Sequence, residues 1–449
     1  MIAIVLCAMA LAASYLAARR GLVQGLAMVL AIGYLYGILR ANVPQTLSHF
    51  IFDAAAAGLY LAVFVGRPSA EERYRTQPLR SWLLLLIGWP LVLVFLPIQD
   101  PLVQLVGLRG SVFLLPFLLI GARLDDEDIQ RLAFWVAILN IGAFGVAAVE
   151  YVVGIEPFFP RNAVTELIYR SKDVAGMTAH RIPSTFTSAH AYASAMAATS
   201  ALVIGAWMQP NAKWRPLFGA ASFATVIGVF MAAARTHMLV LAVIVIAATL
   251  SGRVRLGTRI GWMVALVVMG FVVAQSERLQ RFRTLESTEM VSERLEGSVN
   301  ANFLRLAQEY PLGNGLGGGG TSLPYFLHNR LRERIGMENE YARIMLEQGI
   351  PGLLIWIAFI FWAFVRSPGQ NGTSLSVMPR LLWVAGATYF ASSVSGTGLL
   401  TAVPLTCLLL MYVGWLCARP ARVAARRVVL PDAPRPRAAV EADPLRVAG

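Results

Sequence analysis

The sequence predicts an all-α protein: a polytopic bundle of about 12–14 transmembrane helices with one large, partly helical periplasmic loop. The first observation is composition, because 57% of the 449 residues are hydrophobic and only 14% are charged. A soluble domain is typically about half apolar and a quarter charged. The second is that long apolar blocks alternate with short polar ones from Ile2 to Trp415. Each block approaches the ~20 residues that cross ~30 Å of hydrocarbon, and lipid leaves such a block no backbone partners outside a helix.

The apolar blocks define one transmembrane domain, residues 1–417, followed by a tail, 418–449, that is rich in Pro, Arg and Ala. We expect the first block to remain as a helix, because no small-residue cleavage site follows it, and the tail to be disordered. The three cysteines form no CxxC pair and predict no disulfide framework. The expected spans are 2–17, 21–39, 50–66, 82–97, 104–121, 130–153, 187–208, 214–233, 237–250, 258–274, 351–366, 379–395 and 398–417.

Short basic connectors predict the orientation. Residues 18–20, 67–80, 213–215, 253–259 and 366–380 are rich in Arg or Lys and fall on one side with the tail, which the positive-inside rule makes cytoplasmic. The opposite side then carries the uncharged connectors 41–49 and 395–397 and two long segments, 154–183 and 275–350. The net charge of +13 is therefore expected to orient the protein in the bilayer and not to bind nucleic acid.

Arg235 is the first candidate functional residue. It interrupts an almost purely apolar run, 217–250, which is too long for one span, so two spans are expected to meet there on the outer side. An Arg within the hydrocarbon costs at least ~2.5–3.5 kcal/mol and usually faces a wet cavity or a partner. The alternative is a turn residue whose side chain reaches the membrane interface.

The outer segment 275–350 carries nine Arg and ten Glu, so it is too balanced to attract anions as a whole. Within it, residues 310–320 form a Gly-rich turn that is neither a P-loop nor a dinucleotide-binding fingerprint. Its glycines would let the backbone bend tightly or approach a ligand, unless they provide flexibility alone.

Residues 338–348 predict a short amphipathic helix at the membrane surface, with Tyr341, Ile344 and Met345 on one face. Gly349 would end this helix and Pro351 would start the next span. Glu338, Asn339 and Glu340 stand at its beginning, where capping is the simplest role for all three.

A fourth candidate is the segment 181–190, which leads into a span from the outer side. Its hydroxyls, Arg181 and His190 could bind an anion near a helix N-terminus, while an ordinary N-cap by Ser184 or Thr187 is an equal alternative. Asp53 and Glu150 are expected to reach from span ends toward the interface. The five histidines show no metal-ligand spacing, and neither a metal nor a cofactor is predicted.

Together these motifs resemble the O-antigen ligase and O-antigen/exopolysaccharide polymerase family of bacterial membrane glycosyltransferases, over about residues 102–416. Residues 234–236 are similar to the family's Ser-Arg-Thr/Gly element between two spans. Residues 309–317 are similar to its Pro-Leu-Gly-x-Gly-x-Gly turn. Residues 338–341 through 349–353 are similar to its signature at the end of the large loop. Many ligases have His-Asn where this chain has Glu338-Asn339, and the Glu-Asn version is more similar to polymerases.

The resemblance implies transfer of a glycan from an undecaprenyl-pyrophosphate donor to a sugar hydroxyl, at the outer face of the inner membrane. The leaving pyrophosphate needs fixed positive charge, for which Arg235, Arg294 and Arg181 are the candidates. Glu338 would take over the role of the missing His as general base. The remaining residues, expected to shape the loop or bind the acceptor, are Gly313, Gly315, Gly317, Asn339, Glu340 and His190.

Two other functions remain open. A ligase would use the same donor to transfer finished polysaccharide to lipid A core. A lipid-linked oligosaccharide flippase or another secondary transporter is disfavoured by the long outer loop and by the absence of paired, broken spans. The expected partners are the lipid-linked donor, the acceptor glycan, the lipid bilayer and other polysaccharide-assembly membrane proteins.

Overall fold

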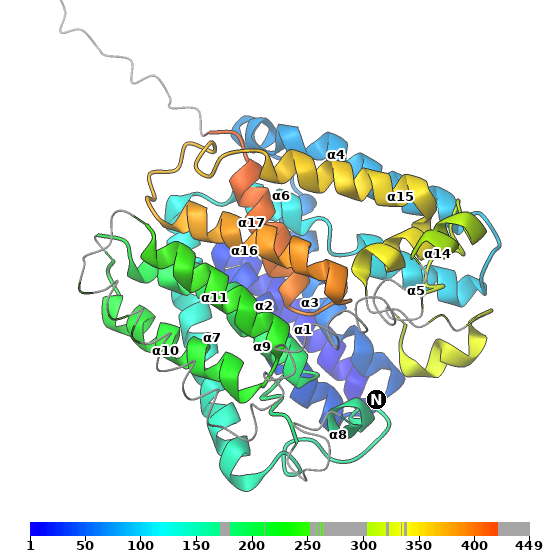
Figure 1. Cartoon of the computed structure of the whole chain (residues 1–449), viewed down its shortest axis with the longest axis horizontal. Coiled ribbons are helices and arrows are strands. Elements are labelled where there is room, and N and C mark those ends of the chain that lie inside the picture. Colours follow the sequence, from blue (N-terminus) through cyan, green and yellow to red (C-terminus); the bar gives the residue numbers. More distant parts are fainter. Residues whose placement is uncertain are drawn as a thin grey trace, which may run out of the picture.

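The computed structural model is a helical bundle without a β-strand in its described part (Figure 1). It describes residues 1–170, 180–210, 212–251, 303–319, 323–333, 335 and 339–420, with the single positions 257, 261 and 264. Within these residues, eight helical segments are long and apolar enough to cross a membrane, and three shorter apolar helices accompany them. The predicted fold class, a polytopic membrane bundle, is confirmed.

Most expected spans match an observed helix to within a few residues. The predicted span 258–274 and the tail beyond residue 420 lie outside the described residues, apart from the single positions 261 and 264. Short helices in the connecting segments are α8 (Glu166–Arg170), α14 (Phe303–Glu309), η4 (Tyr325–Arg330) and η5 (Ser393–Ser395). The main helices are α1 (Ile2–Arg20), α2 (Leu22–Asn42), η1 (Thr46–Phe50) continued by α3 (Ile51–Phe64), α4 (Ala70–Val94), α5 (Pro101–Val112), α6 (Phe117–Arg123), α7 (Asp126–Val153), α9 (Ala189–Trp207), α10 (Arg215–Met231), α11 (Arg235–Thr249), α15 (Glu340–Phe364), α16 (Met378–Ser392) and α17 (Leu405–Cys417).

Three of the segments predicted to be cytoplasmic, 67–80, 366–380 and the start of the tail, lie together at one end of the bundle, which we call the basic end. Most of another such segment, 253–259, lies outside the described residues. Arg419 N donates a hydrogen bond to Arg75 O at 3.1 Å, and Arg75 Nη2 donates to Leu124 O at 2.7 Å. The Thr373 hydroxyl donates to the Asp126 carboxylate at 2.6 Å. These three segments meet around residues 124–126, two of which are acidic and none of which was part of the predicted basic pattern.

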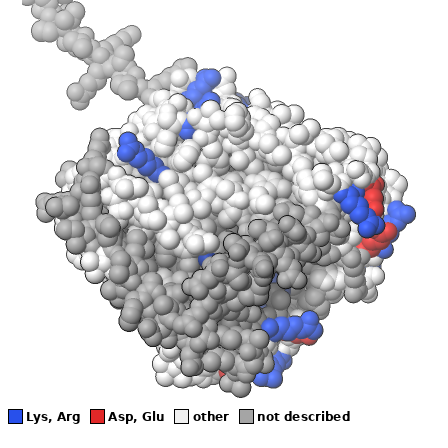
Figure 2. Space-filling view, in the orientation of Figure 1, with Lys and Arg blue, Asp and Glu red and all other residues white. Residues whose placement is uncertain are grey.

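The remaining connectors meet at the opposite end, which we call the loop end. Asn162 Nδ2 donates to Ala41 O at 2.9 Å, and Gln99 Nε2 donates to Asn314 O at 2.8 Å. Figure 2 shows charged side chains at the margins of the molecule, while the described surface between them is almost without charge. This distribution is typical of a protein whose middle faces lipid.

Helix α9 forms the centre of the bundle and packs against α7, α10, α11, α16 and α17. Every residue from Tyr192 to Ala206 is buried, and most of them are small. Small residues also allow α6 and α17 to approach closely. A Cβ on Gly414 would lie 2.1 Å from Leu118 O, and one on Gly121 would lie 2.1 Å from Met411 O. Close backbone approach through small residues is the usual way in which helices associate in membranes.

Two expected continuous spans are interrupted in the structure. The span 104–121 is divided into α5 and α6 by turns at 113–116, because Pro116 supplies no backbone donor and disfavours a helical residue before it. The span 398–417 is helical only from Leu405, because residues 398–404, between Gly398 and Pro404, are not helical. Non-helical backbone at membrane depth is tolerated only where it is buried in protein or lines a cavity.

The expected surface helix before Gly349 is wrong in its location. The chain does break at Gly349 (φ 71°, ψ −176°), as predicted, so the first part of α15 is a helix of its own. However, Glu340 and all residues from Ala342 to Gly349 are buried inside the bundle. The charged side chains of this helix, Glu340, Arg343 and Glu347, form an ion-pair network inside the bundle, which is described below.

Candidate functional site

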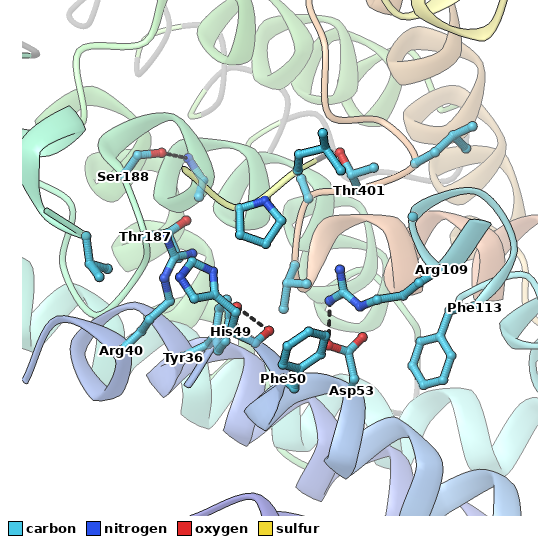
Figure 3. Close-up of a pocket in the computed structure, with 18 of the residues that line it drawn as sticks. Tyr36, Arg40, His49, Phe50, Asp53, Arg109, Phe113, Thr187, Ser188 and Thr401 are labelled. Atoms are coloured by element: carbon cyan, nitrogen blue, oxygen red, sulfur yellow. Dashed lines mark hydrogen bonds and ion pairs between the residues drawn. The ribbon is translucent and has the colours of Figure 1, made fainter. Parts of the chain in front are cut away.

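A cavity of about 550 Å³ lies at the loop end of the bundle (Figure 3). Five described segments far apart in the sequence form most of its wall: the end of α2, the η1–α3 junction, α5 with its following turn, the start of α9, and residues 400–403. Residues just before and within α8, and residues just before and within η4, complete its described part. The volume is in the range of sites that bind small molecules. The lining side chains used below are Tyr36, Arg40, His49, Phe50, Asp53, Arg109, Phe113, Thr187, Ser188 and Thr401.

Of the three arginines that line the cavity among the described residues, two are paired with carboxylates. Arg109 forms an ion pair with Asp53 and its guanidinium lies 5.3 Å from the centre of the Phe50 ring. The Asp53 side chain is 14% exposed and paired with Arg109, so the expectation that it reaches toward the interface is wrong. Arg170 pairs with Glu166 at 2.5 Å within α8. Because both of these arginines are paired, the net positive charge of the described cavity wall comes from the third arginine, Arg40.

That third arginine, Arg40, has no carboxylate partner among the described residues. Its guanidinium lies 5.8 Å from the centre of the Tyr36 ring, and its buried Nε makes no hydrogen bond. In Figure 3, Arg40 lies beside Thr187 and His49 at one side of the cavity, apart from the Asp53–Arg109 pair. The cavity therefore has a cationic side.

The non-helical wall of the cavity is held by Glu340, at the first position of α15. Its carboxylate accepts hydrogen bonds from Gly398 N at 2.8 Å and Leu400 N at 3.4 Å. The same carboxylate binds Arg343 Nη2 at 2.6 Å, and Arg343 Nη1 binds Glu347 at 2.7 Å. All three charged side chains are fully buried. Glu340 thus links a buried charge network to the cavity wall.

Of the three residues for which capping was the simplest role, Asn339 is a side-chain cap in the structure. Asn339 Oδ1 accepts from Tyr341 N at 2.9 Å and Ala342 N at 3.2 Å, so Asn339 is the N-cap of α15. The Tyr341 hydroxyl donates to Phe390 O at 2.6 Å, which joins α15 to the end of α16. Glu338, the predicted general base, lies outside the described residues.

The Gly-rich turn is fixed in place by backbone contacts with α15 and α5. Asn314 N donates to Leu346 O at 2.6 Å, and Ile350 N donates to Pro311 O at 2.9 Å. A Cβ on Gly349 would lie 2.5 Å from Leu312 C, so the turn and the helix break interlock. The predicted loop-shaping glycines Gly313, Gly315 and Gly317 have φ values of 91°, 84° and 77°. These glycines permit close packing against the protein's own backbone. The turn is therefore held in place, and the interpretation that its glycines provide flexibility alone is wrong.

The turn also has a polar contact on its outer side. The Tyr310 hydroxyl, directly before the turn, donates to the Glu333 carboxylate at 2.7 Å, and this bond raises the pKa of Tyr310. Arg305 and Glu309 of α14 form an exposed ion pair next to it. These charged side chains lie outside the bundle and take no part in the buried ion-pair network of Arg343.

Arg181 and His190, two of the predicted site residues, are in contact. Arg181 Nη1 lies 2.9 Å from His190 Nε2, and Arg181 is 6% exposed. The His190 ring lies 6.1 Å from that of His237, which lies 6.1 Å from Tyr389. We call these four residues the Arg–His cluster. The side-chain cap of α9 is Ser188, whose Oγ accepts from Ala191 N at 3.1 Å, and not Ser184 or Thr187.

Arg235 lies where predicted, at the junction of two helices. Helix α10 ends at Met231 and α11 begins at Arg235, two residues before His237 of the Arg–His cluster. Arg294, the other proposed donor-binding residue, lies outside the described residues. Glu150 is 2% exposed and accepts a hydrogen bond from Ser184 N at 2.8 Å, so the expectation that it reaches the interface is wrong.

The cavity and the Arg–His cluster meet at the first turn of α9. Ser188 and Ala191 line the cavity, while His190, between them, contacts Arg181. The structure therefore brings together Arg181, His190 and the helix that Arg235 begins, and connects Glu340 to the cavity wall. The Gly-rich turn packs against α15 and does not line the cavity.

Three functional candidates were missed from the sequence: Arg40, Arg109 and Arg343. Arg40 and Arg109 are single charges in or beside apolar blocks, a signal as strong as that of Arg235. Arg343 follows Glu340 by three residues and precedes Glu347 by four, the spacing of ion pairs on one helix face.

No protein-family model matches this chain, and no curated protein matches its sequence.

Proposed function

We propose that this protein is a membrane glycosyltransferase of the exopolysaccharide/O-antigen polymerase type. It transfers a glycan from an undecaprenyl-pyrophosphate donor to a sugar hydroxyl at the periplasmic face of the bacterial inner membrane. The observation that best supports the proposal is the meeting of the Arg–His cluster and the 550 Å³ cavity at the first turn of α9. A transferase of this kind needs a cationic site for the leaving pyrophosphate and an adjoining space for a sugar.

The Arg–His cluster suits a pyrophosphate leaving group. Charge grows on the phosphate oxygens as the glycosidic bond breaks, so fixed cations at those oxygens lower the barrier. A guanidinium keeps its charge and offers a bidentate fork. Arg181 is buried, which strengthens its field, and Arg235 begins the helix that carries His237. In this proposal both arginines bind the donor, together with Arg294.

The start of α15 suits the acceptor side. A sugar hydroxyl needs a general base, and Glu338 directly precedes the N-cap Asn339. Two residues further on, Glu340 holds the cavity wall through Gly398 N and Leu400 N. In this proposal, Glu338 takes the proton from the hydroxyl of an acceptor seated in the cavity. The basic end is then cytoplasmic and the loop end periplasmic, where lipid-linked repeats are polymerised.

Profiling lipid-linked glycans in a deletion strain tests the proposal. A polymerase defect should leave single repeat units on undecaprenyl pyrophosphate and no long chains. Long chains on the carrier lipid would instead indicate the ligase. Repeats that external reagents cannot reach would indicate a flippase, a class whose sites also use interrupted helices such as α5–α6.

Site variants test the assigned chemistry. Arg235→Ala and Arg235→Lys should both abolish transfer, because Lys keeps the charge but loses the fork. Arg305→Ala is the matched control, since Arg305 also lies at the loop end but its side chain is 72% exposed. Glu338→Gln should reproduce the deletion, because Gln cannot accept the proton. A fully active Arg235→Ala variant would reduce Arg235 to a turn residue.

A further inference from the structure

We infer that the cavity at the loop end is the acceptor subsite, and that Arg40 selects an acceptor glycan with a carboxylate, such as a uronic acid. The assignment of the cavity to the acceptor rests on the proposed function. The preference for a carboxylate is argued separately, from the residues and the charge of the cavity wall.

Arg40 is the origin of the preference. It lines the cavity from the end of α2 and has no carboxylate partner among the residues that the structure describes, while Arg109 and Arg170 are each paired. Its Nε is buried without a hydrogen bond. A buried donor without a partner costs free energy, which a bound carboxylate would recover through a bidentate, charge-assisted pair.

The rest of the wall suits a sugar. Thr187 and Ser188 lie at the start of α9 and Thr401 in the segment held by Glu340, so hydroxyls are present on two sides. Figure 3 shows Tyr36 and Thr187 near Arg40, with Phe50 and Phe113 further along the cavity. Aromatic faces beside a few fixed polar groups are typical of small-molecule sites, and about 550 Å³ accommodates one or two sugar rings.

The position of the cavity separates it from the donor site. His190 lies in the first turn of α9 and Arg181 contacts it from the preceding segment, but neither residue lines the cavity. A carboxylate at Arg40 and a pyrophosphate at the Arg–His cluster would therefore occupy neighbouring sites, with the first turn of α9 between them. Such an arrangement places the two reactants side by side.

Binding to the purified full-length protein in detergent tests the inference without requiring transfer. The probes are a glucuronyl-glucose disaccharide, its neutral methyl ester, and farnesyl diphosphate as a carrier-like anion. The wild type should bind the acid at least about tenfold more tightly than the ester. Arg40→Gln should remove that difference and leave binding of farnesyl diphosphate unchanged, whereas Arg235→Ala should do the reverse.

Three results would overturn the inference: equal binding of acid and ester by the wild type, no binding of either, or a loss of farnesyl diphosphate binding in Arg40→Gln, which would assign the cavity to the donor. Arg305→Gln is the control for a surface charge, and Arg40→Lys keeps a cation if Arg40→Gln does not fold. If the protein shows no glycan transfer but still binds the acid more tightly than the ester, the proposed function is refuted and the carboxylate-binding site at Arg40 remains supported.

Discussion

Replacing Arg343 by Ala should destabilise the protein severely. Arg343 is fully buried and binds Glu340 through Nη2 at 2.6 Å and Nε at 3.2 Å, and Glu347 through Nη1 at 2.7 Å. The substitution would leave two buried carboxylates without a countercharge. Removing one member of a buried ion pair typically costs about 3–5 kcal/mol, because the remaining charge stays in a low dielectric.

A loss of that size is a large part of the ~5–15 kcal/mol by which proteins are usually stable. We therefore expect Arg343→Ala to unfold at a much lower temperature than the wild type, measured by tryptophan fluorescence or by size-exclusion chromatography after heating in detergent. Arg305→Ala provides the matched control. Arg305 also pairs with a glutamate four residues away, but the pair is exposed, so no measurable change is expected.

A third variant separates charge from packing. Changing Glu340 and Glu347 to Gln and Arg343 to Met removes all three charges at similar volume, and replacing a whole buried network in this way is often close to neutral. The triple variant should thus regain most of the stability that Arg343→Ala loses. If Arg343→Ala is as stable as the Arg305→Ala control, the buried network contributes nothing and the reasoning is refuted.

Two further predictions concern topology and the interlocked turn. Reporters fused after Gly315 should read periplasmic and those after Ser367 cytoplasmic, because basic connectors cluster at the end that carries Ser367; the reverse result would place the proposed chemistry in the wrong compartment. Gly349→Ala should lower stability by roughly 1–3 kcal/mol, because the residue has φ 71° and a Cβ would lie 2.5 Å from Leu312 C. Gly142→Ala in α7, where a Cβ meets nothing within 4 Å, should be neutral in the same thermal assay, and equal effects would contradict the interlock.

The local features of the fold were predictable from the sequence. Apolar length located the spans, the charge at Arg235 located the junction of α10 and α11, and Gly349 marked the break in α15. Each of these depends on residues close together in the chain. Interruptions at Pro116 and before Leu405 were missed, because apolar composition continues through both and hydropathy does not register backbone geometry.

The assembly of the site was only partly predictable. Arg181 and His190 are nine residues apart, and their contact follows from a short segment. Arg40 faces a cavity whose other walls come from α5, α9 and residues 400–403, and no local pattern brings these together. Likewise, the spacing of Glu340, Arg343 and Glu347 predicts an ion-pair face equally well in water or in a core. Its burial is decided by distant segments, the Gly-rich turn and residues 398–400.

The wall at residues 398–403 has a consequence for how the cavity can change. Glu340 and the Thr406 hydroxyl, which donates to Leu399 O at 2.8 Å, fix this segment through its main chain. Leu400, Ala402 and Val403 also pack in or against the hydrophobic core, whereas the Thr401 side chain lines the cavity and is absent from that core. The size and polarity of residue 401 can therefore be exchanged while the main-chain contacts retain the path of the segment. A substitution at this single position would alter the chemistry of the cavity wall and leave the bundle around it unchanged.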